Sequence, residues 1–176
     1  MPTKVLIIDG GEASRSRLGQ ILKKLKCWCV LAADEAQARN RLNEHAFELV
    51  LVDIDLPGRL GLDLLQYLRS EFPRMAAIVV TSVDDPLVVD AALEAGVYGY
   101  LVKPVRPTEL FIHVSCALRR RSSEIKLLSR VERLKRALQE RTEAFLEARK
   151  RLVSVEKQLQ GLLSGPDPRI STHLQK

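Results

Sequence analysis

The chain is organised around the stretch Glu48–Gly58, in which an unbroken run of Val and Leu residues ends abruptly on Asp53. A short, continuous apolar run followed by a turn at Pro57-Gly58 predicts a buried strand. Asp53 then lies at the carboxyl end of that strand, which is the edge where open α/β sheets bind ligands. Because Asp is also a common turn residue, capping of the following turn is the alternative.

The rest of the sequence predicts a regular alternation of strands and helices. Four further apolar runs predict strands at residues 4–8, 27–31, 76–80 and 97–102. The spacing of apolar residues predicts helices at residues 12–26, 32–45, 60–70 and 85–95. Asp34 is suited to be the N-cap of the second helix. This order is typical of a doubly wound α/β fold with a five-stranded parallel sheet.

Four of the five predicted strands end on a side chain that can take part in chemistry, namely Asp9, Asp53, Thr81 and Lys103. The carboxyl ends of parallel strands meet at one edge of a sheet, so we expect these side chains to lie close together. Two carboxylates can hold a divalent cation, and a hydroxyl with an ammonium group can hold an anion. The pattern therefore predicts phosphoryl chemistry with a carboxylate nucleophile.

Over residues 3 to about 120 the sequence resembles the flavodoxin-like receiver domain of two-component response regulators. The matching segments are Val5–Asp9, Asp53–Pro57 with Gly61 beyond it, Val79–Ser82 and Gly99–Pro104. The resemblance implies that Asp53 accepts a phosphoryl group from a phosphohistidine of a sensor histidine kinase or phosphotransfer protein. It also implies that Thr81 and Lys103 bind the phosphoryl oxygens.

The resemblance implies a Mg²⁺ site formed by Asp9, Asp53 and the backbone carbonyl of Asp55. Family members usually carry two adjacent acids after the first strand, whereas this chain has Asp9-Gly10. The missing carboxylate predicts a lower Mg²⁺ affinity, which Asp55 could offset in part. A degenerate receiver, folded but regulated without phosphate, is therefore the alternative.

The last predicted strand carries two expectations about the switch between signalling states. The resemblance implies that Tyr100 is the aromatic residue whose rotamer follows Thr81, and that the Lys103-Pro104 bond is cis. Tyr98 and Tyr100 alternate along the predicted strand, so we expect both to face the same side of the sheet.

The fifth predicted helix starts near Pro107, and the first firm break after it is Gly165-Pro166. Apolar residues recur at alternating spacings of four and three along residues 127–162, and only Arg141 interrupts them. This heptad pattern predicts a coiled coil, with a parallel homodimer as the favoured pairing. An antiparallel pair, another partner helix, or a helix folded back on its own domain stays open.

Composition and charge limit the remaining choices. Residues 1–102 hold 11 Lys and Arg against 14 Asp and Glu, whereas residues 103–163 hold 15 against 7. The basic cluster Arg119–Arg121 precedes the heptads as in some DNA-binding zippers, but its positive density is modest, and we expect a solvated helix face rather than nucleic-acid binding. No apolar run is long enough to span a membrane, so we expect no membrane contact.

We expect a receiver domain at 1–120, a helical coiled-coil extension at 121–163 and a flexible tail at 164–176. The predicted role is a cytoplasmic signalling adaptor without an output domain or enzymatic activity of its own. A regulatory piece within a sensor kinase assembly is a further alternative. Cys27 and Cys29 are expected to be reduced, packed thiols rather than half of a zinc site, and His113 is expected to be structural.

Overall fold

The computed structural model describes residues 2–56 and 61–163. In these residues strands and helices alternate, as the sequence predicts. The elements are β1 (Lys4–Ile8), α1 (Glu12–Lys24), β2 (Trp28–Ala32), α2 (Glu35–Glu44), β3 (Leu49–Val52), α3 (Gly61–Glu71), β4 (Ala76–Thr81), α4 (Pro86–Glu94), β5 (Gly99–Val102) and α5 (Pro107–Leu163). The predicted N-cap is confirmed, because the Asp34 carboxylate accepts a hydrogen bond of 2.7 Å from the backbone N–H of Gln37.

The five strands form one parallel sheet in the order β2-β1-β3-β4-β5. Parallel neighbours require crossover connections, and here each connection contains a helix. The register pairs Ile8 with Val52 and Thr81 with Val102. The residues that follow β1 and β3 therefore emerge side by side, and Lys103 follows β5 beside the end of β4. The expected doubly wound fold is confirmed.

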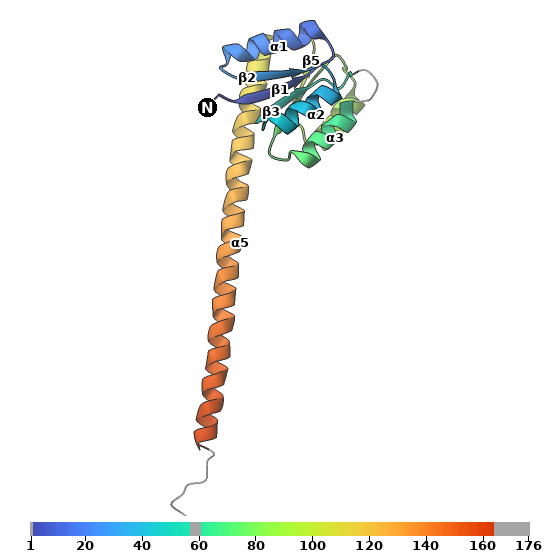
Figure 1. Cartoon of the computed structure of the whole chain (residues 1–176). Coiled ribbons are helices and arrows are strands. Elements are labelled where there is room, and N and C mark those ends of the chain that lie inside the picture. Colours follow the sequence, from blue (N-terminus) through green and yellow to red (C-terminus); the bar gives the residue numbers. More distant parts are fainter. Residues whose placement is uncertain (1, 57–60, 164–176) are drawn as a thin grey trace, which may run out of the picture. The chain divides into compact units, whose positions relative to one another are not determined.

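Both faces of the sheet are covered by helices, as Figure 1 shows for α1 on one side and α2 and α3 on the other. One buried cluster packs α2, α3 and α4 against Leu6, Ile8 and their neighbours. A second cluster packs α1 and the first turns of α5 against Val5 and Ile7. Successive side chains of a strand point to opposite faces. Burial on both faces explains why β1, β3 and β4 read as continuous apolar runs.

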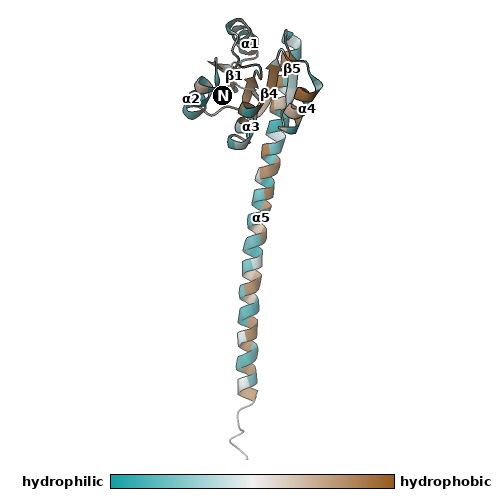
Figure 2. Cartoon of the chain, turned by 90° about the vertical axis from the view of Figure 1, so that its right-hand side faces the viewer, coloured by the Kyte–Doolittle hydropathy of each residue, from teal (hydrophilic) through white to brown (hydrophobic). Residues whose placement is uncertain are grey.

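The chain divides into two compact units, Met1–Lys126 and Leu127–Lys176. In the first unit, α5 contributes the buried residues Leu110, Val114 and Ala117 to the core. In the second unit, every side chain of the described residues 127–163 is exposed. Figure 2 shows apolar and polar residues interleaved along this part of α5.

Candidate functional site

Asp9 follows β1 and is fixed by the first turn of α1. Its backbone N–H donates a hydrogen bond of 3.1 Å to the carbonyl of Ala32, which extends the pairing of β1 with β2. Its carboxylate accepts bonds from the backbone N–H of Gly11 at 2.8 Å and from Oγ of Ser14 at 2.6 Å. The side chain is buried, so these contacts hold a carboxylate in one orientation inside the domain.

Asp53 follows β3 directly beside Asp9. Its backbone N–H donates to the carbonyl of Ile8 at 2.8 Å, so the strand register continues through this residue. The carboxylate is 5% exposed, and its Oδ1 accepts a bond of 2.9 Å from the backbone N–H of Asp55. Asp55 itself is exposed. The other carboxylate oxygen of Asp53 is directed toward Lys103.

Lys103 connects the two carboxylates. Its Nζ lies 2.7 Å from Oδ2 of Asp9 and 2.5 Å from Oδ2 of Asp53. Burial by itself lowers the pKa of Lys103, but the hydrogen bonds to both carboxylates and their attraction outweigh it and raise the pKa above its ordinary value. The Lys103-Pro104 peptide bond is cis, as the resemblance implied. Asp9, Asp53 and Lys103 thus form one charged cluster at the edge of the sheet.

Thr81 and Tyr100 are linked to this cluster through the segment after β4. Thr81 is fully buried, and its carbonyl accepts a bond of 2.8 Å from the backbone N–H of Lys103. Its Oγ1 accepts a longer bond of 3.3 Å from the backbone N–H of Val83, and the Tyr100 hydroxyl donates to the carbonyl of Val83 at 2.8 Å. The two predicted switch residues therefore contact the same residue, Thr81 through its backbone N–H and Tyr100 through its carbonyl.

The comparison with known protein families agrees with this geometry. The profile of the family described as "Response regulator receiver domain" matches residues 5–115. The chain belongs to the response regulator receiver family.

Two curated relatives of this receiver are larger proteins. A cyclic di-GMP phosphodiesterase of Thermotoga maritima is 31% identical over 134 residues, which are 76% of this chain and 36% of that protein. The response regulator protein PilR of Pseudomonas aeruginosa is 34% identical over 121 residues, which are 69% of this chain and 27% of PilR. The chain therefore spans about a third of the length of these relatives.

Solved receiver structures cover a similar share of this chain. A CheY-like receiver domain protein of Methanospirillum hungatei shares 28% identity and a TM-score of 0.67, covering 70% of this chain and 99% of that one. A two-component response regulator of Clostridium difficile shares 26% identity and a TM-score of 0.64, covering 67% and 97%. Among the described residues of this chain, no helix is long and apolar enough to cross a membrane.

Sequence reasoning missed two residues of the receiver site, Ser14 and Arg15. Ser14 donates to the Asp9 carboxylate, and Nη1 of Arg15 lies 2.5 Å from the Asp9 carbonyl oxygen. Both lie in the first turn of α1, and their position after β1 was the only signal that could have indicated them. Gly10, in contrast, is exposed and supplies no carboxylate. In the described part of the chain, no three His, Cys, Asp or Glu side chains are grouped closely enough to hold a metal ion by themselves.

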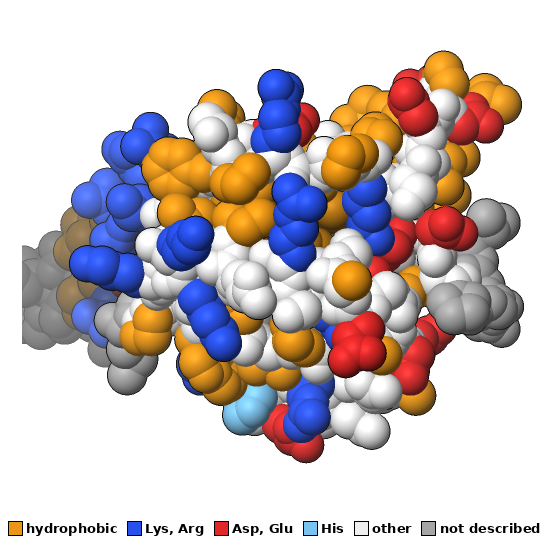
Figure 3. Space-filling view, turned by 90° about the horizontal axis from the view of Figure 1, so that it is seen from above, with side chains coloured by type: hydrophobic (Ala, Val, Ile, Leu, Met, Phe, Trp, Pro, Cys, Tyr) orange, Lys and Arg blue, Asp and Glu red, His pale blue; other side chains and the backbone are white. Residues whose placement is uncertain are grey.

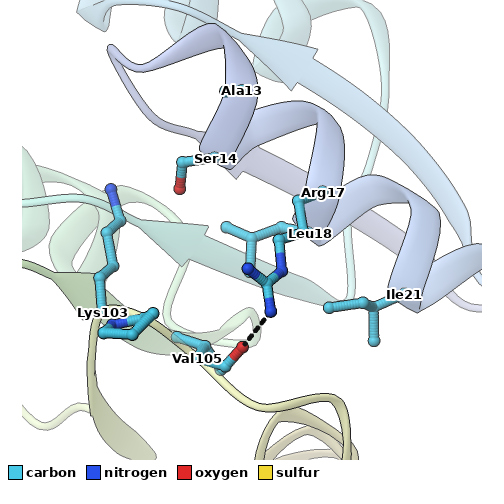
Figure 4. A pocket seen from close by; sticks show the side chains of 8 residues that line it. Ala13, Ser14, Arg17, Leu18, Ile21, Lys103 and Val105 are labelled. Atoms are coloured by element: carbon cyan, nitrogen blue, oxygen red, sulfur yellow. Dashed lines mark hydrogen bonds between the residues drawn. The ribbon is translucent and has the colours of Figure 1, made fainter.

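A cavity of about 250 Å³ lies between α1 and the segment after β5. Its lining includes Ser14, Arg17, Lys103 and Val105, and Nη2 of Arg17 donates to the Val105 carbonyl at 3.5 Å (Figure 4). Figure 3 shows the α1 side of the domain, where Lys and Arg side chains are spread among apolar ones.

The expectation that Tyr98 and Tyr100 share one face is wrong. β5 begins only at Gly99, so the strand alternation does not extend to Tyr98. Tyr98 packs with the cluster on the α1 and α5 side, and Tyr100 packs with the cluster on the other side. The Tyr98 hydroxyl donates to Glu124 of α5, and the Arg120 guanidinium lies 4.7 Å from the Tyr98 ring centre. Tyr98 therefore attaches α5 to the sheet.

The remaining candidate residues have structural roles. Cys27 and Cys29 are free thiols packed against the α1-side cluster, as expected. Burial, with a smaller contribution from Cys27, raises the pKa of Cys29 to about 11. A Cβ added at Gly99 would lie 2.8 Å from Nδ1 of His113, so His113 fills the space that this glycine leaves.

Proposed function

We propose that this receiver accepts a phosphoryl group on Asp53 from the phosphohistidine of a sensor histidine kinase or a phosphotransfer protein. The observation that supports this most directly is the buried Asp53 carboxylate, whose Oδ2 lies 2.5 Å from Nζ of Lys103. A carboxylate beside a fixed ammonium group can act as a nucleophile toward phosphorus, because the cation remains to balance the charge of the product.

In the proposed step, one carboxylate oxygen of Asp53 forms a bond to phosphorus while the bond between phosphorus and the donor imidazole nitrogen breaks. The electron pair of the broken bond stays with the imidazole. The acyl phosphate carries its negative charge on the phosphoryl oxygens rather than on the carboxylate. Lys103 then binds a phosphoryl oxygen in place of the Asp53 carboxylate, and the Thr81 hydroxyl binds another.

Mg²⁺ is the proposed cofactor of this step, held by Asp9, Asp53 and the backbone carbonyl of Asp55. The donor set fits a hard cation, because the buried carboxylates of Asp9 and Asp53 already bind the Lys103 ammonium group between them. Its Nζ lies 2.7 Å from Oδ2 of Asp9 and 2.5 Å from Oδ2 of Asp53. When bound, Mg²⁺ would spread the negative charge of the phosphoryl oxygens. Because Gly10 brings no ligand, we expect the affinity to be lower than that of a site with two adjacent acids.

The proposed switch starts from the weak bond between Thr81 and Val83. When the Thr81 hydroxyl turns to a phosphoryl oxygen, the backbone N–H of Val83 loses a bond of 3.3 Å. Tyr100 is bonded to the same residue through its carbonyl, so its rotamer can follow that segment. Phosphorylation would thereby shift the equilibrium between two arrangements of the surface near α4. The size of the shift is set by how much more favourably the phosphoryl group interacts with one arrangement than with the other.

We further propose that the chain acts as a cytoplasmic adaptor, by binding rather than catalysis, and that residues 127–162 pair with a second copy. The exposed apolar residues of this segment and the three free thiols support these proposals. The proposed division stays receiver domain 1–120, helical extension 121–163 and tail 164–176. The tail lies outside the described residues.

The test is the intact mass of the full chain after incubation with acetyl phosphate and Mg²⁺. We expect the mass of one phosphoryl group to be gained by the native chain and not by Asp53→Ala. Gly10→Asp restores the second acid, so it should reach the same occupancy at a lower Mg²⁺ concentration. A gain that persists in Asp53→Ala would contradict the proposed acceptor.

Gly10 supports a second candidate function, a scaffold whose receiver fold is kept without phosphorylation. In that case the native chain gains no mass, whereas Gly10→Asp does. A regulatory piece of a sensor kinase assembly is a variant of either function, and it requires a kinase module on a bound chain. Co-purification of this chain with a kinase that phosphorylates Asp53 would favour that variant.

A further inference from the structure

The exposed apolar seam of α5 is uneven in size and charge. It consists of Leu127, Val131, Leu134, Leu138, Arg141, Phe145, Ala148, Leu152, Val155, Leu159 and Leu162. In heptad notation, the first a positions are Val131, Leu138 and Phe145. The first d positions are Leu127, Leu134 and Arg141. Nine of these side chains are large, apolar and exposed. The small Ala148 and the charged Arg141 occupy the middle.

A parallel pair would match each seam residue with its own copy. Arg141 would then face Arg141 and Ala148 would face Ala148, which places two like charges and an under-filled layer next to each other. The bulky Phe145 would face Phe145 between them. At the flanks, Arg130 would face Lys135 of the second copy twice, which is repulsive, and Arg151 would face Glu156 twice, which is attractive, so the flanking charges of a parallel pair bring no net gain.

We propose that the seam binds a second copy of this chain in antiparallel orientation, with the two-fold axis between residues 146 and 147. This inference rests on the proposed self-pairing of residues 127–162 and adds its direction and register. In an antiparallel pair, a positions of one helix meet d positions of the other. Phe145 then packs on Ala148 of the second copy, so a large residue fills the space beside a small one. By symmetry this contact occurs twice.

The same register separates the like charges. Arg141 meets Leu152 of the second copy, and its long side chain can lie along that residue with the guanidinium in water. At the flanks, Lys135 faces Glu156 of the second copy, and this ion pair also occurs twice. The next antiparallel register would instead bring Lys135 against Arg149. Charge complementarity therefore selects one register.

The contact area is sufficient for a stable pair. Residues 127–162 form a helix about 54 Å long. In this register Leu127 would lie opposite residue 166, which is outside the described residues, and the other eight large apolar side chains of each copy, at about 50 Å² apiece, would bury about 800 Å² in total. Leu128 and Leu163, which meet in this register, add about 200 Å² from the two copies, and the total of about 1,000 Å² reaches the lower limit for a specific interface. The two Leu127 residues would lie about 60 Å apart, so the two receivers are joined to opposite ends.

A distance measurement between spin labels at Gly161→Cys tests the orientation in the full chain. A Cβ at Gly161 meets nothing within 4 Å, so the label should leave the helix unchanged. The background carries Cys27→Ala, Cys29→Ala and Cys116→Ser, and this background without the new cysteine is the control. We expect about 45 Å between the labels, from 29 residues of helical rise. A distance below about 25 Å would establish a parallel pair and overturn the inference while keeping the self-pairing. A monomer in sedimentation would overturn both.

Reversal of one charge gives an independent test with opposite signs for the two orientations. Lys135→Glu replaces two attractive contacts with Glu156 by repulsive ones in the antiparallel pair, so we expect the dimer dissociation constant to rise about tenfold. In a parallel pair the same change relieves repulsion by Arg130 and tightens the dimer. Lys150→Glu on the outer face of the helix is the matched control. Adding Glu156→Lys to Lys135→Glu should restore affinity, and unchanged or tighter binding of Lys135→Glu would overturn the inference.

Discussion

Replacement of Lys103 by Met is the change that should reveal the charged cluster most clearly. Met has a similar length and no charge, so the substitution leaves the space filled and removes only the ammonium group. Asp9 and Asp53 are 1% and 5% exposed, and each has an oxygen within 2.7 Å of Nζ of Lys103. In Lys103→Met two buried carboxylates face each other without a cation.

The loss of stability can be bounded from these contacts. Breaking a buried ion pair by removing one partner costs about 3–5 kcal/mol. The Lys103 side chain is 18% exposed, so water screens part of its interaction with the carboxylates. We therefore expect Lys103→Met to lower the free energy of unfolding by about 3 kcal/mol at pH 7, near the lower end of this range. Mg²⁺ should stabilise the variant more than the native chain, because the cation replaces the missing charge.

The assay is urea denaturation at pH 7 followed by circular dichroism, with and without Mg²⁺. Lys24→Met on the surface of α1 is the control for loss of a lysine. Adding Asp53→Asn to Lys103→Met should recover much of the stability at pH 7, since only one charge is then buried. The reasoning would be refuted by a Lys103→Met variant that is as stable as the native chain, or by a Lys103→Met, Asp53→Asn double variant that recovers none of the lost stability.

Two substitutions and one reactivity measurement test other parts of the fold. Gly61→Ala should destabilise the domain by about 3 kcal/mol in the same assay, because a Cβ there would overlap the backbone that follows β3, whereas Gly161→Ala should not destabilise it. Cys29 should be alkylated about 100-fold more slowly at pH 8 than an ordinary thiol, because burial raises its pKa to about 11 and the thiolate is the reactive form; equal rates for Cys29 and the exposed Cys116 would contradict this. Tyr98→Phe removes a hydrogen bond to α5 and should cost about 1 kcal/mol, with faster amide exchange in residues 117–126; unchanged exchange would mean that Tyr98 does not anchor the helix.

The Cys29 shift also makes stability depend on pH. Its pKa is higher in the folded than in the unfolded chain, so the unfolded thiol ionises first as pH rises. The contribution of this thiol is therefore present below about pH 9 and decreases as pH rises from 9 toward 11. Cys29→Ala should show a weaker decline over that window than the native chain.

The sheet and the site could be predicted because a few residues carry strong signals. A continuous apolar run that stops on a charged residue marks both a buried strand and its carboxyl end, and this holds for Asp9, Asp53 and Lys103. The parallel register then brings those ends together whatever the details of the helices. These features depend on burial and strand order, which the sequence pattern expresses directly.

Contacts that depend on side-chain direction could not be predicted in this way. Ser14 and Arg15 look like ordinary residues of a helix, and only the position of the α1 turn brings them to Asp9. The face of Tyr98 was predicted wrongly because the predicted strand began at residue 97, whereas β5 begins at Gly99, so the alternation of side chains does not extend to Tyr98. The proposed partner of the α5 seam is a second copy of the chain, and contacts between two chains are not expressed in the sequence pattern of one of them.

The measurement that tests the central claim most directly is the position of the phosphoryl group. The full chain is treated with acetyl phosphate and Mg²⁺, the acyl phosphate is reduced with borohydride, and the peptides are sequenced by mass spectrometry. Reduction converts a phosphorylated aspartate into homoserine. We predict homoserine at Asp53 and at no other aspartate. Modification of Asp9 or Asp55 instead, or no modification of the native chain when Gly10→Asp is modified, would contradict the claim that Asp53 is the working phosphoacceptor.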